Sequence, residues 1–232
     1  CADGKNGEKY VLKIDMPEDL GGEFSRIIET LKLADGQGYA KLYAYDRKRK
    51  ACLLERLGKP ISQSDYPVRQ QLEIICTALK KTWDIPAANA GLPDGSASIA
   101  WFQEFIGETW ESLNHPCPWN AIDWAFFFLQ SREEALNPSE FVLLHGDAHG
   151  GNTLRTLSGD DYKFIDPDGI YYEKAYDLGV LMREWVDEYT QQPLEKGKQR
   201  CEYLHALTGV PAQAIWEWGY PQTVSTAFVF LK

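Results

Sequence analysis

The first sixty residues alternate apolar and polar positions as strands do, with one helical interval. In KYVLKID (9–15), the period of two places Val11 and Lys13 on the same face of a predicted strand. Residues 18–33 repeat apolar side chains at helical spacing and end at the glycine-containing ADGQG. Two more strand patterns, YAKLYAYD and ACLLERL, flank the basic turn RKRK (47–50). We therefore predict a small sheet with one helix.

After GKPISQSDYP the apolar period becomes that of helices. Predicted helices cover 68–83 and 102–113, and the segment 120–136 is apolar almost all round, which predicts a central buried helix. The run FVLLHGD is followed by a predicted hairpin, NTLRTLSGDDYKFID. From Lys174 a helix with one apolar stripe is predicted to continue through Tyr189, and further helices close the chain.

These patterns predict an α+β protein of two domains. Residues 1–58 form a sheet-rich lobe and residues 59–232 a mainly helical lobe. With 232 residues, 44% of them apolar and 13% aromatic, the chain is long enough to bury a core. It opens in what reads as mid-strand, so we expect the start of the first lobe, including a nucleotide-cradling loop, to be missing.

The charge and the cysteines narrow the class of protein. A net charge of −10 disfavours a nucleic-acid partner and suits a cationic small molecule. No segment has the pattern of a membrane span or of a signal peptide, so we expect no membrane association and a cytoplasmic location. The five scattered cysteines, without any C-x-x-C pair, disfavour a disulfide framework and a thiolate zinc site.

The polar segment HGDAHGGN (145–152) directly follows a predicted buried strand. Its aspartate and asparagine, Asp147 and Asn152, are five positions apart, as in the catalytic loop of kinases. The next predicted strand ends in KFIDPDG, which places Asp166 and Asp168 where carboxylates can face the same phosphates. We therefore predict a phosphoryl-transfer site.

The sheet lobe supplies the residues for a nucleotide. Lys13 is placed to contact the α- and β-phosphates, and a carboxylate on the next helix would pair with it. We choose Glu23 as this partner, with Glu29 in reserve. The segment LLERLG (53–58) ends the last strand before the helical lobe, and its backbone at Glu55 and Leu57 is placed to bond adenine.

With these motifs, the chain resembles the aminoglycoside phosphotransferase family, small-molecule kinases with the two-lobed protein-kinase-like fold. The pattern HGDxHxxN and the pair IDPDG and AYDLG resemble its streptomycin and hydroxyurea kinase branch. The resemblance implies Asp147 as catalytic base and Asn152 and Asp166 as ligands of Mg²⁺, with ATP as phosphoryl donor. It also implies that Asp177 is a buried anchor for the catalytic loop, although its place at a helix start would suit a carboxylate anyway.

Two histidines leave a choice of interpretation. His145 and His149 form H-x-x-x-H, which on a helix would suit zinc, but the intervening glycines favour a loop and the glutamate of H-E-x-x-H is absent. We expect His145 to support the loop. His149 would either support the loop or lie near the phosphates.

The predicted activity is ATP-dependent transfer of the γ-phosphate to a hydroxyl of a small, cationic molecule such as an aminoglycoside. Gly146 stands where protein kinases have arginine, and ten residues between Asp166 and Asp177 leave no room for an activation loop, which favours a small-molecule acceptor. Two alternatives stay open. One is a metabolite kinase acting on choline, a sugar amine or homoserine, and the other is a pseudokinase that binds nucleotide without catalysis.

Overall fold

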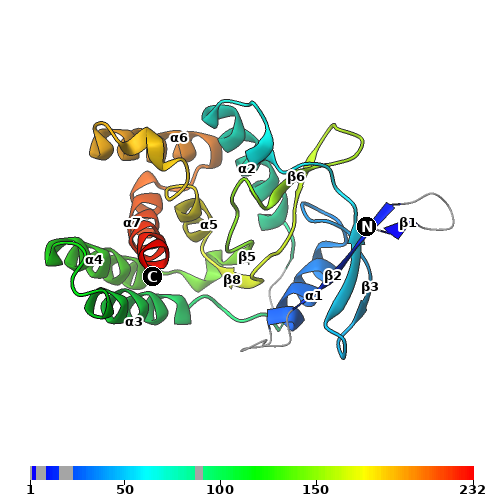
Figure 1. Cartoon of the computed structure of the whole chain (residues 1–232), viewed down its shortest axis with the longest axis horizontal. Coiled ribbons are helices and arrows are strands. Elements are labelled where there is room, and N and C mark those ends of the chain that lie inside the picture. Colours follow the sequence, from blue (N-terminus) through cyan, green and yellow to red (C-terminus); the bar gives the residue numbers. More distant parts are fainter. Residues whose placement is uncertain (1, 4–8, 16–22, 87–90) are drawn as a thin grey trace. The chain divides into compact units, whose positions relative to one another are not determined.

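The computed structural model describes residues 2–3, 9–15, 23–86 and 91–232, and their contacts divide the chain into two compact units (Figure 1). The first unit contains residues 1–93 and 142–171, and the second contains residues 94–141 and 172–232. The predicted domain boundary after residue 58 stays a prediction. Within the part of the chain that the structure describes, no helix is long and apolar enough to cross a bilayer.

The first unit is built on an antiparallel sheet in the order β1-β2-β4-β3. Its strands are β1 (Ala2–Asp3), β2 (Lys9–Ile14), β3 (Leu42–Asp46) and β4 (Ala51–Glu55). The register pairs Lys13 with Cys52, which is only 1% exposed, whereas Leu12 and Ile14 are 54% and 65% exposed. The face that carries Lys13 is therefore the inner one, and the predicted strand is confirmed.

Two helices and two short strand pairs complete this unit. Helix α1 (Glu23–Ala34) packs on β3, and α2 (Val68–Trp83) packs on β5 (Val142–Leu144) and β7 (Tyr162–Phe164). Strand β7 forms the predicted hairpin with β6 (Thr153–Arg155), and β5 pairs with β8 (Ile170–Tyr172). A 3₁₀ turn, Ile61–Gln63, precedes α2. The core contains apolar side chains of both helices and of β5 and β7: Ile28, Leu31, Ile75, Leu79, Leu143, Leu144 and Phe164.

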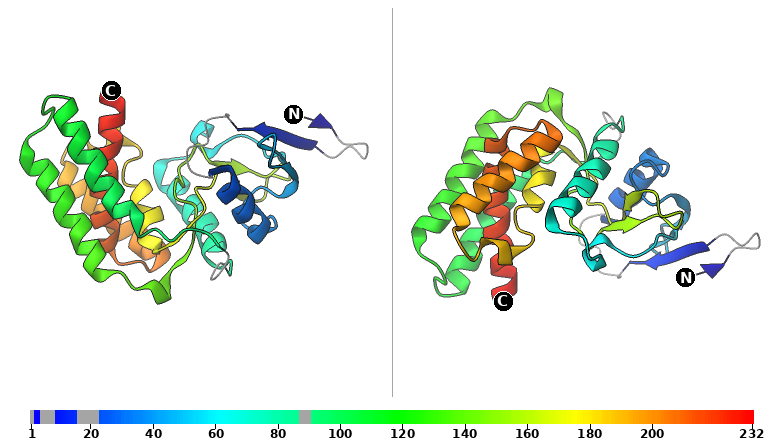
Figure 2. Two further views of the ribbon diagram at one scale, coloured as in Figure 1. Left: turned by 90° about the horizontal axis from the view of Figure 1, so that it is seen from below. Right: turned by 90° about the horizontal axis from the view of Figure 1, so that it is seen from above.

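The second unit is helical and is organised around one helix. It contains α3 (Ala97–Ser112), α4 (Trp119–Ala135), α5 (Lys174–Val180), α6 (Pro193–Thr208) and α7 (Ala212–Leu231), with 3₁₀ turns at Pro138–Glu140 and Val186–Tyr189. Helix α7 contacts each of the other four (Figure 2). The arrangement of small sheets and a helical majority confirms the predicted α+β class.

The prediction that 120–136 is a central buried helix is wrong. Helix α4 buries one face, with Ile122, Ala125 and Leu129 fully enclosed, but Trp124 and Phe127 are more than half exposed. The central position belongs to α7, where Trp218 is fully buried. Aromatic residues all round a helix therefore did not mean burial all round.

The helix predicted from Lys174 through Tyr189 is also shorter than expected. Helix α5 ends at Val180, and Trp185 has a left-handed backbone with φ of +52°. The guanidinium of Arg200, from α6, donates to the carbonyls of Leu181 (3.1 Å) and Glu184 (2.7 Å). These carbonyls would bond amides one turn onward in a continued helix, so this distant arginine stabilises the break.

Another arginine, Arg132 of α4, joins three elements of the second unit. Its guanidinium donates to both carboxylate oxygens of Glu173 (3.1 and 2.7 Å) and to Glu217 of α7 (3.1 Å). The two carboxylates also accept hydrogen bonds from Ser131, Gln213 and Trp218. All three charged side chains are at most 16% exposed. Their charges are stabilised by each other and by hydrogen bonds rather than by water.

We expect Arg132→Gln to lower the free energy of unfolding by about 3–5 kcal/mol, because it leaves two buried carboxylates without their cation. Arg69→Gln is the matched control, since Arg69 is 76% exposed and lies 3.8 Å from Glu73. That exposed pair contributes less than about 1 kcal/mol. Urea denaturation measures both variants, and equal losses would contradict the assigned role of the buried network.

Candidate active site

The loop between β5 and β6 holds the predicted catalytic residues, all within the first unit. It begins with His145, which is fully buried between the rings of Tyr39 and Phe164, at centroid distances of 5.9 and 4.7 Å. The His145 Nδ1 atom accepts the amide hydrogen of Asp147 (3.1 Å), and Nε2 donates to the carbonyl of Ile165 (2.9 Å). This neutral ring therefore joins the loop to the residue before Asp166.

Burial disfavours the charged form of this imidazole. It lowers the pKa of His145 from 6.5 to about 4, against the opposing effects of the Ile165 carbonyl and the nearby carboxylates. The ring is thus neutral at physiological pH, which its hydrogen bonds also require, since a protonated ring has no acceptor for the Asp147 amide.

Asp147, His149 and Asn152 are held together within the loop. The Asn152 side-chain amide donates to the Asp147 carbonyl (3.0 Å) and, at 3.4 Å, to its carboxylate. The His149 Nδ1 atom accepts from the Gly151 amide (3.0 Å), and Nε2 lies 3.4 Å from Asp147 Oδ2. The Asp147 carboxylate is about one third exposed, so it is fixed by neighbours while remaining accessible.

Gly146 and Asp168 show why the loop contains glycine. Gly146 has φ of +89°, and a Cβ atom there would lie 2.4 Å from Asp168 Oδ2. The Asp168 amide donates to the carbonyl of His145 (2.8 Å). A side chain at position 146 would therefore separate the catalytic loop from the turn that contains Asp166 and Asp168.

Asp166 and Lys13 meet directly. Lys13 Nζ lies 2.8 Å from Asp166 Oδ1 and 3.4 Å from Asp15 Oδ1. Burial lowers the pKa of Lys13, but the hydrogen bond and charge of Asp166, together with Asp15, outweigh it and raise the pKa above its usual value. Asp166 itself has a left-handed backbone, φ +56°, a conformation that non-glycine residues adopt mainly where function or context demands it. The structure thus brings the predicted lysine and the predicted metal ligand together.

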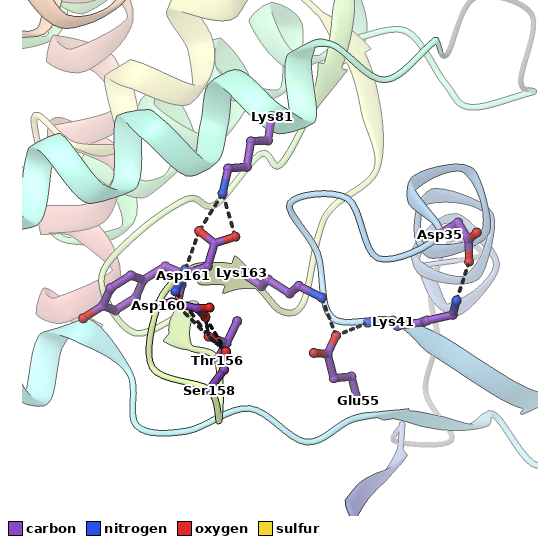
Figure 3. Close-up of polar contacts among 10 residues, drawn as sticks. Asp35, Lys41, Glu55, Lys81, Thr156, Ser158, Asp160, Asp161 and Lys163 are labelled. Carbon is purple, nitrogen blue, oxygen red and sulfur yellow. Dashed lines mark hydrogen bonds and ion pairs between the residues drawn. The ribbon is translucent and has the colours of Figure 1, made fainter. Parts of the chain in front are cut away.

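Glu55 is predicted to contact the nucleotide through its backbone. Its side chain holds the segment 53–58 against neighbouring residues. Its carboxylate accepts from Lys163 of β7 (2.7 Å) and from the Lys41 amide (3.0 Å), as Figure 3 shows. On the β6–β7 hairpin, which also carries Lys163, Asp161 pairs with Lys81 of α2 (Figure 3). Leu57 is buried. The contact of Glu55 and Leu57 with adenine stays a prediction.

Three other predicted residues, Glu23, Glu29 and Asp177, lie outside the catalytic loop. Glu23 is the first residue of α1 and is exposed, and its pairing with Lys13 stays a prediction. The reserve choice, Glu29, pairs instead with Lys32 and Arg47. Asp177 is fully buried in α5 of the second unit, and its role as anchor of the catalytic loop stays a prediction. Asp15 was not predicted from the sequence, because a carboxylate on the following helix was expected to pair with Lys13.

The loop offers oxygen ligands rather than a zinc site. Each ring nitrogen of His145 and His149 already has a protein partner. Across the described ranges, no group of three histidine, cysteine or acidic side chains is arranged to hold a metal. The hydrogen bonds of Asn152 within the loop use its side-chain nitrogen and not its Oδ1 atom. The Ile165 amide donates to the Asn152 carbonyl (3.0 Å), which places Asp166 next to the residue bonded to Asn152. A carboxylate and an amide oxygen fit Mg²⁺.

Comparison with known proteins places this fold among phosphotransferases. The choline kinase LicA from Streptococcus pneumoniae is 17% identical with a TM-score of 0.64, covering 99% of this chain and 79% of that one. The aminoglycoside phosphotransferase APH(3'')-Id from Streptomyces rimosus, solved with ADP and streptomycin, is 13% identical with a TM-score of 0.64, covering 96% and 89%. An ethanolamine kinase from Plasmodium vivax is 16% identical with a TM-score of 0.63, covering 98% and 71%. These likenesses confirm the protein-kinase-like fold.

The family follows from the sequence over almost its whole length. Residues 3–232 match the family model described as aminoglycoside/hydroxyurea antibiotic resistance kinase, and no curated protein matches the chain. The chain belongs to this family, which confirms the resemblance seen in its motifs. It is therefore a phosphotransferase with an alcohol group as acceptor.

Stability should depend on pH through His145. Its pKa is about 4 in the folded protein and about 6.5 when unfolded, so the unfolded state binds more protons between these values. The free energy of unfolding should therefore be fully retained above pH 6.5 and fall as pH drops toward 4, by about 3 kcal/mol from this residue.

Denaturation of the wild type and of His145→Asn at several pH values measures this effect. Asparagine keeps one donor and one acceptor but does not titrate, so its curve should lack this part of the slope. His115→Gln, at an exposed position, serves as control and should follow the wild type. Parallel curves for the wild type and His145→Asn would contradict the role given to the buried imidazole.

Proposed function

We propose that the protein transfers the γ-phosphate of ATP to a hydroxyl group of a small cationic molecule, an aminoglycoside or a compound of similar chemistry. The observation that carries this proposal is the convergence in one unit of Lys13, Asp166 and the Asp147–Asn152 loop, with Lys13 and Asp166 in contact at 2.8 Å. The family supports it, as does the ADP and streptomycin in the complex of the Streptomyces rimosus structure. The net charge of −10 favours a cationic acceptor.

In this function, Asp147, whose side chain is about one third exposed, orients the acceptor hydroxyl and accepts its proton. His149 and Asn152 both contact its Oδ2 atom, so the base meets the hydroxyl in one orientation. Asn152 and Asp166 would hold Mg²⁺, which offsets the negative charge of the transferred group when it is bound. Lys13 provides a positive charge for the nucleotide phosphates.

A metabolite kinase is the second candidate. It is favoured by the structural likeness to the choline kinase from Streptococcus pneumoniae and to the ethanolamine kinase from Plasmodium vivax. Choline and ethanolamine are small amino alcohols, and both carry a hydroxyl near a cationic nitrogen. We also propose that the protein is cytoplasmic, as expected from the sequence.

The acceptor class is tested by ATP consumption with magnesium against a panel of aminoglycosides, hydroxyurea, choline, ethanolamine and homoserine. Phosphorylation of an aminoglycoside supports the first candidate, and turnover confined to an amino alcohol supports the second. Thermal stabilisation by nucleotide without turnover of any acceptor would indicate a pseudokinase.

Asp147→Asn should lower kcat by at least about 100-fold, since a positioned base typically contributes that much to proton transfer. Its dissociation constant for ADP should stay within about twofold of the wild-type value, because Asp147 is assigned to the acceptor rather than to the nucleotide. Asp160→Asn, which removes an exposed carboxylate from the β6–β7 turn, should leave both quantities unchanged. Equal loss of turnover and nucleotide binding in Asp147→Asn would contradict the assignment.

A further inference from the structure

Lys13 has two carboxylate neighbours on the inner side of the sheet lobe, Asp166 and Asp15. Asp166 Oδ1 lies 2.8 Å from Lys13 Nζ, and Asp15 Oδ1 lies 3.4 Å from it. Asp15 directly follows β2, and its amide donates to the Lys50 carbonyl (2.9 Å), which extends the pairing of this strand with its neighbour. Since side chains two apart on a strand share a face, Asp15 is held beside Lys13 by the strand itself.

Once nucleotide and magnesium are bound, these two carboxylates cannot both pair with the Lys13 ammonium group to the same extent. Asp166 is the proposed metal ligand, and a divalent cation competes with an ammonium group for the same oxygens. Asp15 is 19% exposed at its side chain, already charge-paired with Lys13, and belongs to no proposed metal site. It is therefore the carboxylate that can stay with the lysine.

Resting on the proposed function, we propose that Asp15 is a positioning residue that holds the Lys13 ammonium at the nucleotide phosphates while Asp166 binds the metal. A lysine side chain has many rotamers and loses conformational entropy when it is fixed in one, so a partner that already holds it favours nucleotide binding. An ammonium group has three hydrogens and can donate to a carboxylate and to phosphate oxygens at the same time.

Helix α1 contacts the turn that contains Asp168 and Gly169. Arg26 of α1 donates through Nε to the Asp168 carbonyl (3.3 Å). Gly169 has φ of +67°, and a Cβ atom there would lie 2.4 Å from Thr30 Oγ1 and 3.0 Å from the Arg26 carbonyl. Helix α1 thus packs directly on the turn that follows Asp166. In this arrangement, α1 positions the turn that follows Asp166, the proposed metal ligand. Strand β2 and the residue after it supply both Lys13 and its partner Asp15.

The test compares nucleotide affinity with and without magnesium. For Asp15→Asn, the dissociation constant of ADP with Mg²⁺ should rise about tenfold, the effect expected on losing a hydrogen bond between charged groups. Without Mg²⁺, Asp166 is still free to hold Lys13, so the dissociation constant should rise less than about twofold. The KM for ATP should rise by the same factor as the magnesium-dependent affinity, with kcat changed far less.

Two further variants make the result specific. Asp46→Asn removes an exposed carboxylate of the same sheet that pairs with Arg49, and it should leave both dissociation constants unchanged. Glu23→Gln tests the helix carboxylate expected from the sequence, and its magnesium-dependent affinity shows whether that carboxylate or Asp15 stays with Lys13. Asp15→Glu restores the charge on a longer side chain and should recover most of the lost affinity.

The outcomes separate this inference from the proposed function. A wild-type protein that binds no ADP and phosphorylates no acceptor would overturn the proposed function. A wild-type protein that does both, with Asp15→Asn unchanged or weakened equally with and without Mg²⁺, would overturn the role of Asp15 alone. A magnesium-dependent loss of ADP affinity in Glu23→Gln, and not in Asp15→Asn, would also overturn the role of Asp15. If Asp15→Asn does not fold, Asp15→Ser, which also removes the charge, takes its place, and an unchanged affinity or a loss that is independent of Mg²⁺ contradicts the proposal.

Discussion

The buried imidazole of His145 is the contact on which the geometry of the candidate site depends. It accepts the Asp147 amide hydrogen through one nitrogen and donates to the Ile165 carbonyl through the other. Only a neutral imidazole has one donor and one acceptor, so burial and hydrogen bonding select the same protonation state. One uncharged ring thereby sets the spacing between the segments that carry the candidate base and the candidate metal ligand.

Around this uncharged ring, the charged groups come from separate elements. The sheet supplies Lys13, the β6–β7 hairpin leads into Asp166, and the loop supplies Asp147. Phosphoryl transfer needs fixed charges more than it needs covalent chemistry, and rigid strand ends provide them. Glycines at 146 and 169 let the loop and α1 approach the turn that contains Asp166 and Asp168 closely.

The second unit uses buried arginines for a similar purpose. Arg132 joins α4, the start of α5 and α7 through two carboxylates, and Arg200 bonds carbonyls where α5 gives way to a turn. A planar guanidinium with five donors can satisfy several acceptors in different directions, which an ammonium group does less well. Removing such a residue takes a donor away from several buried acceptors at once, so these positions tolerate little change.

The sequence by itself determined the strands and most of the helices, and it also predicted the loop that holds the candidate catalytic residues. These features depend on local periodicity and on fixed spacing within one loop, such as the five positions from Asp147 to Asn152. Only the tertiary structure decided where α5 ends, which face of α4 is exposed and which carboxylate lies beside Lys13. Each of these depends on contacts between distant residues or on atomic distances, as with Arg200 and Leu181 or Lys13 and Asp166. Such contacts leave no periodic signal in the chain, because they arise when already formed elements pack together.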